Sequence, residues 1–305
     1  MATTLFTYDD ATRREDVSEQ VYELSVSEGY LLRTLPKIKA TNTLHEYITD
    51  SLAAAADNAN IEGADFSADT IVAPTRKSNI TQIFDKAILV SRTEQSVSHH
   101  AINDVFEYQK NKKLKELSND IELALMRGTT ASGTGTAARR LRGLIASITT
   151  NATAQASGQT LTEAILGDGI ESAYNQGANV DHIFAGMKLK RQMSKFAANS
   201  TRFIGADDQK LNSVVSIYES DASEKPVKLI SHRFMLGAVS GDGTAAGVVG
   251  IDSDHFAIAQ LDAPFFKKLN ENGDHERGLA VAELTLEDRN EKAGFKITNL
   301  HYATF

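Results

Sequence analysis

Residues 41–91 constrain the fold of this chain more than any other stretch, because they predict a projecting hairpin that is too long to pack against the rest of the chain. We call this hairpin the limb and the remaining domain the body. Strand-like runs at Thr43–Ile48 and Ile80–Val90 frame a middle, Ala53–Arg76, that is rich in Ala, Asp and Asn. An extended hairpin with arms of about 20 residues, at ~3.3 Å per residue, reaches roughly 65 Å. A compact domain of the remaining residues has a radius of gyration of only about 18 Å. We therefore expect the limb to contact another molecule.

The next stretch holds the longest predicted helix, at about Glu94–Arg127. Apolar residues recur at helical spacing on both sides of a polar segment at Gln109–Lys113. Thr93 or Ser96 can cap the start, and Gly128 follows the end, where glycine often terminates a helix. Such a helix is ~50 Å long, which exceeds the width of a core of this size. Two interpretations stay open: a long surface helix, and the central spine of a flat subunit.

The other segments predict helices and strands that are segregated along the chain more than alternated. Residues 1–39 are polar and predict an arm, with one short helix around Asp16–Leu24. The later elements are a small-residue loop at Gly128–Gly143, helices at Leu161–Gln176 and Met187–Ala198, strands from Val214 onward, and two final strands between Leu279 and Phe305. This order predicts an α+β fold.

Composition excludes several classes of protein. The 305 residues carry a formal net charge of -8, whereas proteins that grip nucleic acid normally present a basic face or a basic balance. Cysteine is absent, so cysteine-based zinc sites, iron–sulfur clusters and thiol nucleophiles are excluded, and a reducing cytosol suits the chain best. No run approaches the roughly 20 apolar residues of a membrane helix, and no signal peptide is expected.

Candidate catalytic and metal-binding motifs are incomplete. His45–Thr49 begins like a zinc-protease helix but has threonine where the second histidine belongs. His99 and His100 are adjacent in the predicted helix and diverge by about 100°, so they do not share one metal face. Asp254–His255 and Asp274–His275 are carboxylate–imidazole pairs, but no serine lies in a G-x-S-x-G turn. We therefore predict no catalytic, cofactor-binding or metal-binding residue.

Arg139, Arg140 and Arg142 form a basic cluster at the end of the small-residue loop. Such a cluster could bind phosphate or nucleic acid. Arginines grouped in this way more often pair with carboxylates. We favour carboxylate partners, either within the chain or across a subunit contact.

The order of these elements resembles the Hong Kong 97-type fold of tailed-phage major capsid proteins. Within that group, the chain is similar to the SU-ten-like major head proteins over most of residues 1–150. The stretches that carry the similarity are Arg14–Val17, Thr43–Leu52, Asn79–Ile83 with Val90–Ser91, Lys115–Glu122 and Ala138–Leu144. Ser27–Tyr30 departs from the family pattern, because a proline-containing turn is expected there.

The resemblance implies an α+β subunit with an N-terminal arm at 1–39, an extended loop at 40–92, a peripheral domain at 93–150 and 255–305 with a spine helix at 94–127, and an axial domain at 151–254. It implies that identical subunits form pentamers and hexamers, which close into an icosahedral head around packaged double-stranded DNA. A separate scaffold protein and a portal protein are expected partners, with assembly in the bacterial host cytoplasm and a final location in the virion. No enzyme activity, cofactor, membrane contact or sequence-specific DNA binding is expected.

Residues of the limb and of the basic cluster are predicted to contact neighbouring subunits. They are Ile61, Glu62, Phe66, Arg76, Arg139 and Arg140. An encapsulin-like compartment, which encloses a protein cargo in a shell of the same fold class, is the main alternative. A hydrolase with an unrecognised carboxylate site is a remote one.

Overall fold

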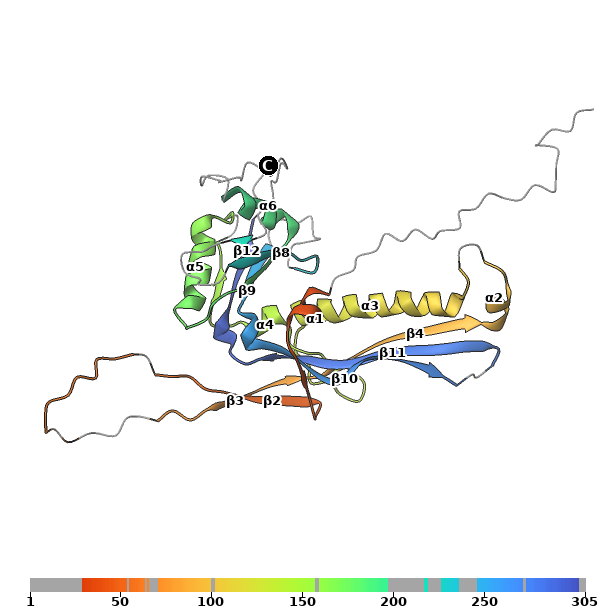
Figure 1. The fold of residues 1–305 in the computed structure, drawn as a ribbon, viewed down its shortest axis with the longest axis horizontal. Coiled ribbons are helices and arrows are strands. Elements are labelled where there is room, and N and C mark those ends of the chain that lie inside the picture. Colours follow the sequence, from red (N-terminus) through yellow and green to blue (C-terminus); the bar gives the residue numbers. More distant parts are fainter. Residues whose placement is uncertain are drawn as a thin grey trace, which may run out of the picture.

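A computed structural model describes residues 29–53, 55–63, 65, 71–99, 102–156, 159–196, 217–218, 226–235, 246–270 and 273–301 of the chain. The arm helix predicted around Asp16–Leu24 lies outside these residues. The molecule is elongated, with a two-stranded limb at one end and a long helix that runs toward the other end (Figure 1).

A four-stranded sheet underlies the long helix α3 (Val105–Arg127), in the strand order β1, β10, β11, β4. Its strands are β1 (Lys37–Lys39), β10 (Phe256–Leu269), β11 (His275–Asp288) and β4 (Gln82–Ser91). β1 runs parallel to β10, and the other neighbours are antiparallel. Alternate residues of β4 and β11, such as Phe84 and Ala282, are buried on the face that α3 covers.

Helix α3 begins later than predicted, so the continuous helix at Glu94–Arg127 is wrong in its first part. Arg92–Ser96 forms a separate short helix, α2, and Val97 after it is extended. Ser91 caps α2 and Asp104 caps α3, each through a side-chain oxygen that accepts a backbone N–H of the first turn. Asp104 prevents α3 from extending further toward the N-terminus, because an N-cap residue must itself have an extended backbone.

Gly128 ends α3, as predicted, but its backbone is not left-handed: its φ is -54°. A Cβ at this position would lie 2.5 Å from the carbonyl oxygen of Ala124 and 2.8 Å from that of Leu141. The N–H of Gly143 donates to the carbonyl oxygen of Gly128 at 2.9 Å. Glycine is therefore required because the returning loop packs directly against the helix end.

A six-stranded sheet forms the second part of the molecule, in the order β5, β12, β9, β6, β8, β7. Its strands are β5 (Ala152–Ala154), β12 (Gly294–Leu300), β9 (Ala246–Ile251), β6 (His182–Ala185), β8 (Val227–Ser231) and β7 (Ile217–Tyr218). Helices α5 (Glu163–Tyr174) and α6 (Met187–Phe196) confirm the helices predicted at Leu161–Gln176 and Met187–Ala198. β12 pairs with β5 and β9, so residues 255–305 divide between the two sheets instead of all following the long helix.

Strands β2 (Leu44–Thr49) and β3 (Thr75–Ile80) pair antiparallel along their whole length and form the limb. The projecting hairpin is therefore confirmed. Its second arm is shorter than predicted, because β4 follows Thr81 and joins the four-stranded sheet beside β11. Figure 1 shows the limb on the side of that sheet opposite to α3.

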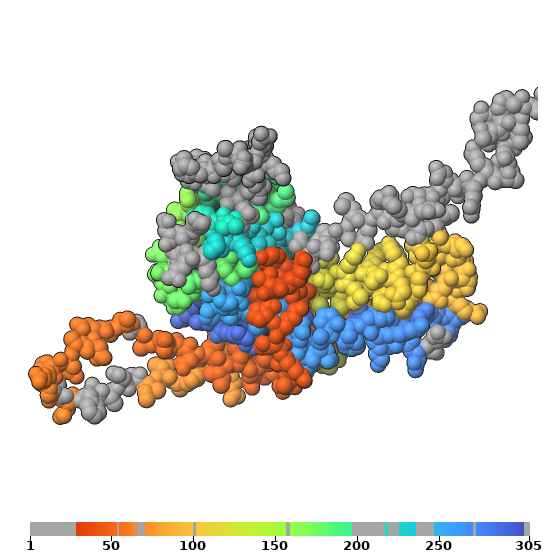
Figure 2. Space-filling view, viewed as in Figure 1, coloured from red at the N-terminus to blue at the C-terminus, as the bar shows by residue number. Residues whose placement is uncertain are grey.

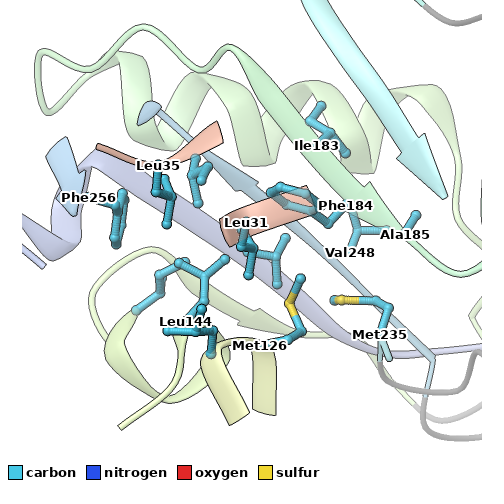
Figure 3. Packing of buried hydrophobic residues seen from close by; sticks show 14 of the residues in the cluster. Leu31, Leu35, Met126, Leu144, Ile183, Phe184, Ala185, Met235, Val248 and Phe256 are labelled. Carbon is cyan, nitrogen blue, oxygen red and sulfur yellow. The ribbon is translucent and has the colours of Figure 1, made fainter. Parts of the chain in front are cut away.

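One continuous hydrophobic core joins the two sheets (Figure 3). Leu31 of the short helix α1 (Tyr30–Thr34) and Leu35 after it lie in this core together with Met126 of α3 and Phe184 of β6. The short elements are α4 (Leu144–Ser147) and the 3-10 turns η1 (Ser253–His255) and η2 (Glu291–Ala293). The segment that follows residues 1–28 is thus built into the core.

Candidate inter-subunit surfaces

Hydrogen bonds of the buried Asn79 of β3 connect the limb to the body. Its Nδ2 donates to the carbonyl oxygen of Arg142 at 3.0 Å and to that of Leu286 at 2.7 Å. Its Oδ1 accepts the backbone N–H of Arg142 and that of Ile80, each at 2.9 Å. All four hydrogen-bonding positions of the amide are used, so this side chain fixes the direction of the limb.

The other strand of the limb is held by two carboxylates at the end of β11. Nε2 of His45 lies 2.6 Å from Oε2 of Glu287, and the Tyr47 hydroxyl donates to Asp288. Nη2 of Arg142 lies 3.2 Å from Oδ2 of Asp288. Burial raises the pKa of the Asp288 carboxyl, and the Tyr47 hydrogen bond and the Arg142 charge offset only part of that rise. Both strands are therefore anchored to the body by polar contacts.

Beyond its paired strands, the limb exposes large apolar side chains. The exposed fraction is 99% for Leu52, 93% for Ile71 and 82% for Ile61. Figure 2 shows this segment extending away from the body. Apolar side chains gathered in an exposed segment mark a binding surface more often than a solvated one. No described residue of the same chain covers them.

The predicted contact residues of the limb lie at different depths along it. Ile61 and Glu62 are both exposed in the far segment. Arg76 lies on β3, where its Nη1 is 3.6 Å from Oε2 of Glu46 across the hairpin. Phe66 lies outside the described residues. Contact of these residues with a neighbouring subunit stays a prediction.

Two of the three arginines of the basic cluster, Arg139 and Arg142, pair with carboxylates inside the chain. Nη2 of Arg139 lies 2.7 Å from Oε1 of Glu283, and Arg142 binds Asp288 as described above. This confirms the preference for carboxylate partners and places them within the subunit. Arg140 is exposed and lines an open cavity of about 650 Å³ between β4 and the C-terminal half of α3. The cluster lies on the body, and a subunit contact through Arg139 or Arg140 stays a prediction.

The four-stranded sheet exposes several apolar side chains among charged ones on the face opposite to α3. Ile83 and Leu89 lie on β4, and Phe265 of β10 is paired with Val281 of β11. The exposed fractions of Ile83, Leu89 and Phe265 lie between 44% and 65%. In β4 they alternate with buried residues such as Phe84, so they point away from α3. We call this side of the sheet, with Ile83, Leu89, Phe265 and Val281, the helix-free face.

The predicted carboxylate–imidazole pairs are not assembled as a catalytic site. His255 has Asp252 as its carboxylate partner, with Nδ1 3.2 Å from Oδ2. The Ser253 hydroxyl donates to Asp181, so a carboxylate and not an imidazole accepts its hydrogen. Asp274 pairs with Arg92 at 2.7 Å. Among the described residues, no group of three His, Asp or Glu side chains could hold a metal ion, and none of the helices is long and apolar enough to cross a membrane.

Two polar positions that the sequence pattern did not single out are central to the structure. Asn79 occupies a buried position of an alternating strand, where an apolar residue is usual. Glu122 is fully buried next to Ile121 in α3. The local pattern marked neither position, because Ile80, the one apolar residue of β3, lies on the other face of that strand, and Glu122 lies beside the apolar stripe of α3.

Comparison with known proteins places these features in a family. A family model described as SU10 major capsid protein matches residues 2–301. The major capsid protein of Escherichia phage Phieco32 is 29% identical over 127 residues, which is 41% of this chain. The chain covers only 36% of the length of that relative.

Solved structures show the same fold at low sequence identity. The capsid chain of a native GTA particle has a TM-score of 0.67 at 12% identity. The match covers 96% of this chain and 97% of the GTA chain. A chain from Microbacterium phage Oxtober96 has a TM-score of 0.64 at 13% identity, with 95% and 96% covered. The SrpI encapsulin from Synechococcus elongatus PCC 7942 has a TM-score of 0.63 at 11% identity, with 95% of each chain covered. These matches confirm the α+β, Hong Kong 97-type capsid fold.

The fold alone does not separate a phage capsid from an encapsulin, because both match this chain equally well. The family model does separate them, since it spans nearly every residue and describes one kind of shell. It also confirms the resemblance carried by stretches such as Thr43–Leu52 and Ala138–Leu144. The chain belongs to the SU10 major capsid protein family.

Proposed function

We propose that this chain is the shell subunit of a phage head, in which identical copies form pentamers and hexamers that close into an icosahedral shell around packaged double-stranded DNA. Family membership supports this function. The single observation that carries it is the limb, whose apolar side chains find no cover among the described residues of their own chain. A scaffold protein and a portal protein are further partners, and the head assembles in the host cytoplasm before it becomes part of the virion.

The limb of one copy binds the helix-free face of the next copy. Figure 1 shows the limb leaving one end of the body while α3, β4 and β11 run toward the other end, with the limb on the helix-free side of the sheet. A head-to-tail arrangement therefore brings Ile61 and Ile71 of one copy over Leu89 and Phe265 of the next. Such heterologous contacts close into a ring when the rotation between copies divides a full turn.

Many contacts of modest size are sufficient for a stable shell. A standard protein–protein interface buries roughly 1,600 Å² in total. Each copy donates one limb and accepts another, so every subunit in a ring is held on two sides. The second contact of a subunit forms at a high effective concentration once the first exists, which makes the closed shell more stable than any one pair.

The domain division follows the two sheets. Residues 1–39 form the arm, 40–92 the extended loop, and 93–150 the start of the peripheral domain around α3; β4 lies within 40–92 but belongs with the peripheral part by its pairing with β11. Residues 151–254 form the axial domain at the centre of each ring. β12 belongs with the axial part by its strand pairing, although it lies within 255–305. Ile61, Glu62, Phe66 and Arg76 contact the neighbour through the loop, and Arg139 and Arg140 through the body.

Charge introduced on either side of the contact tests this function. Ile61→Lys on the limb and Leu89→Lys on the helix-free face replace exposed residues, so both variants should fold with wild-type thermal stability. We expect both to lose shell formation, measured by electron microscopy and by sedimentation. Met187→Lys is the matched control, because Met187 is 69% exposed on α6, away from both surfaces. Normal shells from Ile61→Lys and Leu89→Lys would refute the proposed contact.

A further inference from the structure

Glu122 of α3 is a buried carboxylate at which three parts of the chain meet. Its side chain and that of His232 are both 0% exposed. Oε1 accepts the backbone N–H of Leu31 at 2.7 Å, and Oε2 accepts that of Leu32 at 3.3 Å. Oε1 also lies 3.0 Å from Nε2 of His232, the residue that follows β8. One carboxylate thus connects α1, the long helix and the six-stranded sheet.

The neighbours of His232 determine where its proton lies. The backbone N–H of Phe234 donates to Nδ1 at 3.3 Å, so Nδ1 is the acceptor of the ring and Nε2 carries the hydrogen. His232 therefore donates to Glu122. Three N–H donors are thus directed at the two oxygens of Glu122, and both oxygens act as acceptors.

Helix α1 depends on this carboxylate because it has no cap of its own. Gly29 stands at the cap position and makes no side-chain hydrogen bond. The first-turn amides of Leu31 and Leu32 would be left unpaired next to the core without Glu122, and a buried unpaired N–H is costly. This is also where Ser27–Tyr30 departs from the proline-containing turn expected of the family. The carboxylate of Glu122, which is distant in sequence, therefore accepts the N–H groups at the start of α1 and takes the place of a local cap.

Apolar packing holds α1 in place but does not set its direction. Leu31 and Leu35 are buried in the main core. Burial of leucine is non-directional, whereas two adjacent N–H groups on one carboxylate fix the orientation of the helix axis. Burial of a polar group carries a desolvation cost, so a leucine-rich core gains little stability from it. Orientation is what the carboxylate adds.

We propose that Glu122 is a positioning residue that fixes the orientation of α1 relative to the long helix and the six-stranded sheet, and that assembly of neighbouring copies depends on this orientation. The inference rests on the proposed shell function and extends it to a residue that lies outside every contact surface described above. Through His232, the same carboxylate links α1 to the six-stranded sheet, so α1 and that sheet keep one mutual orientation during assembly.

Amide hydrogen exchange on the full-length, dissociated subunit tests the anchor at single residues. Glu122→Gln keeps the size of the side chain but replaces one acceptor oxygen by an NH₂ donor, so one amide of α1 loses its partner. We expect the amide that loses its acceptor, at Leu31 or Leu32, to exchange at least about tenfold faster, while the amides of β11 keep their wild-type rates. Glu116→Gln is the control, because Glu116 lies on the same helix and pairs with Lys113 at the surface. Unchanged exchange at Leu31 and Leu32 would overturn the proposal.

Assembly of the same variants separates a positioning role from a purely structural one. We expect Glu122→Gln subunits to give few or irregular shells and Glu116→Gln subunits to give normal ones. Normal shells from Glu122→Gln, despite faster exchange in α1, would overturn the positioning role and leave the shell function intact. A wild-type chain that forms no shells would instead refute the shell function on which the inference rests.

A second pair of variants keeps the test valid if Glu122→Gln does not fold. His232→Gln retains a donor toward Glu122, whereas His232→Leu removes it. We expect faster exchange at Leu31 and Leu32 and poorer shells for His232→Leu than for His232→Gln. Equal behaviour of the two variants would overturn the proposal.

Discussion

Replacement of Asn79 with alanine should release the limb from the body. The substitution removes four hydrogen bonds, two donated by Nδ2 and two accepted by Oδ1. At a net value of about 1 kcal/mol each, their loss lowers the free energy of unfolding by about 3–4 kcal/mol. The buried carbonyl of Leu286 loses a partner that water cannot easily replace, so the upper part of this range is expected.

Urea unfolding of the dissociated subunit, followed by circular dichroism, measures this loss. Ser78→Ala is the matched control, because Ser78 is exposed on the same strand and its removal should change stability by less than about 0.5 kcal/mol. Faster amide exchange in β2 and β3 should accompany the loss in Asn79→Ala. A change below about 1 kcal/mol, with unchanged exchange in the limb, would refute the idea that Asn79 anchors it.

Two further predictions concern the second sheet. Gly167→Ala and Gly169→Ala in α5 should shift the thermal unfolding temperature in opposite directions. Gly169→Ala should lower it, because a Cβ at 169 would lie 2.8 Å from Cδ2 of the buried Phe295 and cost about 1–3 kcal/mol of stability. Gly167→Ala should raise it, because Gly167 faces open space and alanine adds about 0.5–1 kcal/mol of helix propensity. Equal shifts would contradict the packing of α5 on β12. Burial opposes ionisation of Glu291, but hydrogen bonds from Thr150 and its neighbour outweigh that effect and lower the pKa of the carboxyl to about 2. A lowered pKa in the folded state stabilises the fold above the ordinary value of 4.5 and loses this contribution as the pH falls toward 2. After allowance for solvent screening, the wild type should lose on the order of 2 kcal/mol more than Glu291→Gln over that interval, and parallel stability curves would contradict this.

Local patterns in the sequence were sufficient to predict the helices and strands whose partners are near in the chain. The hairpin of β2 and β3 follows from two strand-like runs around a weakly patterned middle, and α5 and α6 follow from helical spacing. The limb's exposure was also predictable, because its length alone exceeds what the body can cover. The pairing of Arg139 and Arg142 with carboxylates followed from chemistry, but the identity of Glu283 and Asp288 did not.

The features that escaped prediction depend on contacts between distant residues. The start of α3 was missed because Thr93, Ser96 and Asp104 are all capable caps, and only the folded chain decides among them. The place of β12 depends on β5 and β9, which local periodicity does not reveal. Glu122 receives donors from Leu31 and His232, which lie 91 and 110 positions away along the chain.

Cryo-electron microscopy of the purified chain tests the central claim most directly, because it shows both the assembly and the position of the limb. The account predicts closed shells in which the segment around Ile61 and Ile71 of each copy lies on Leu89 and Phe265 of a neighbour. A chain that stays monomeric at every concentration, with its limb folded back on its own body, would contradict it.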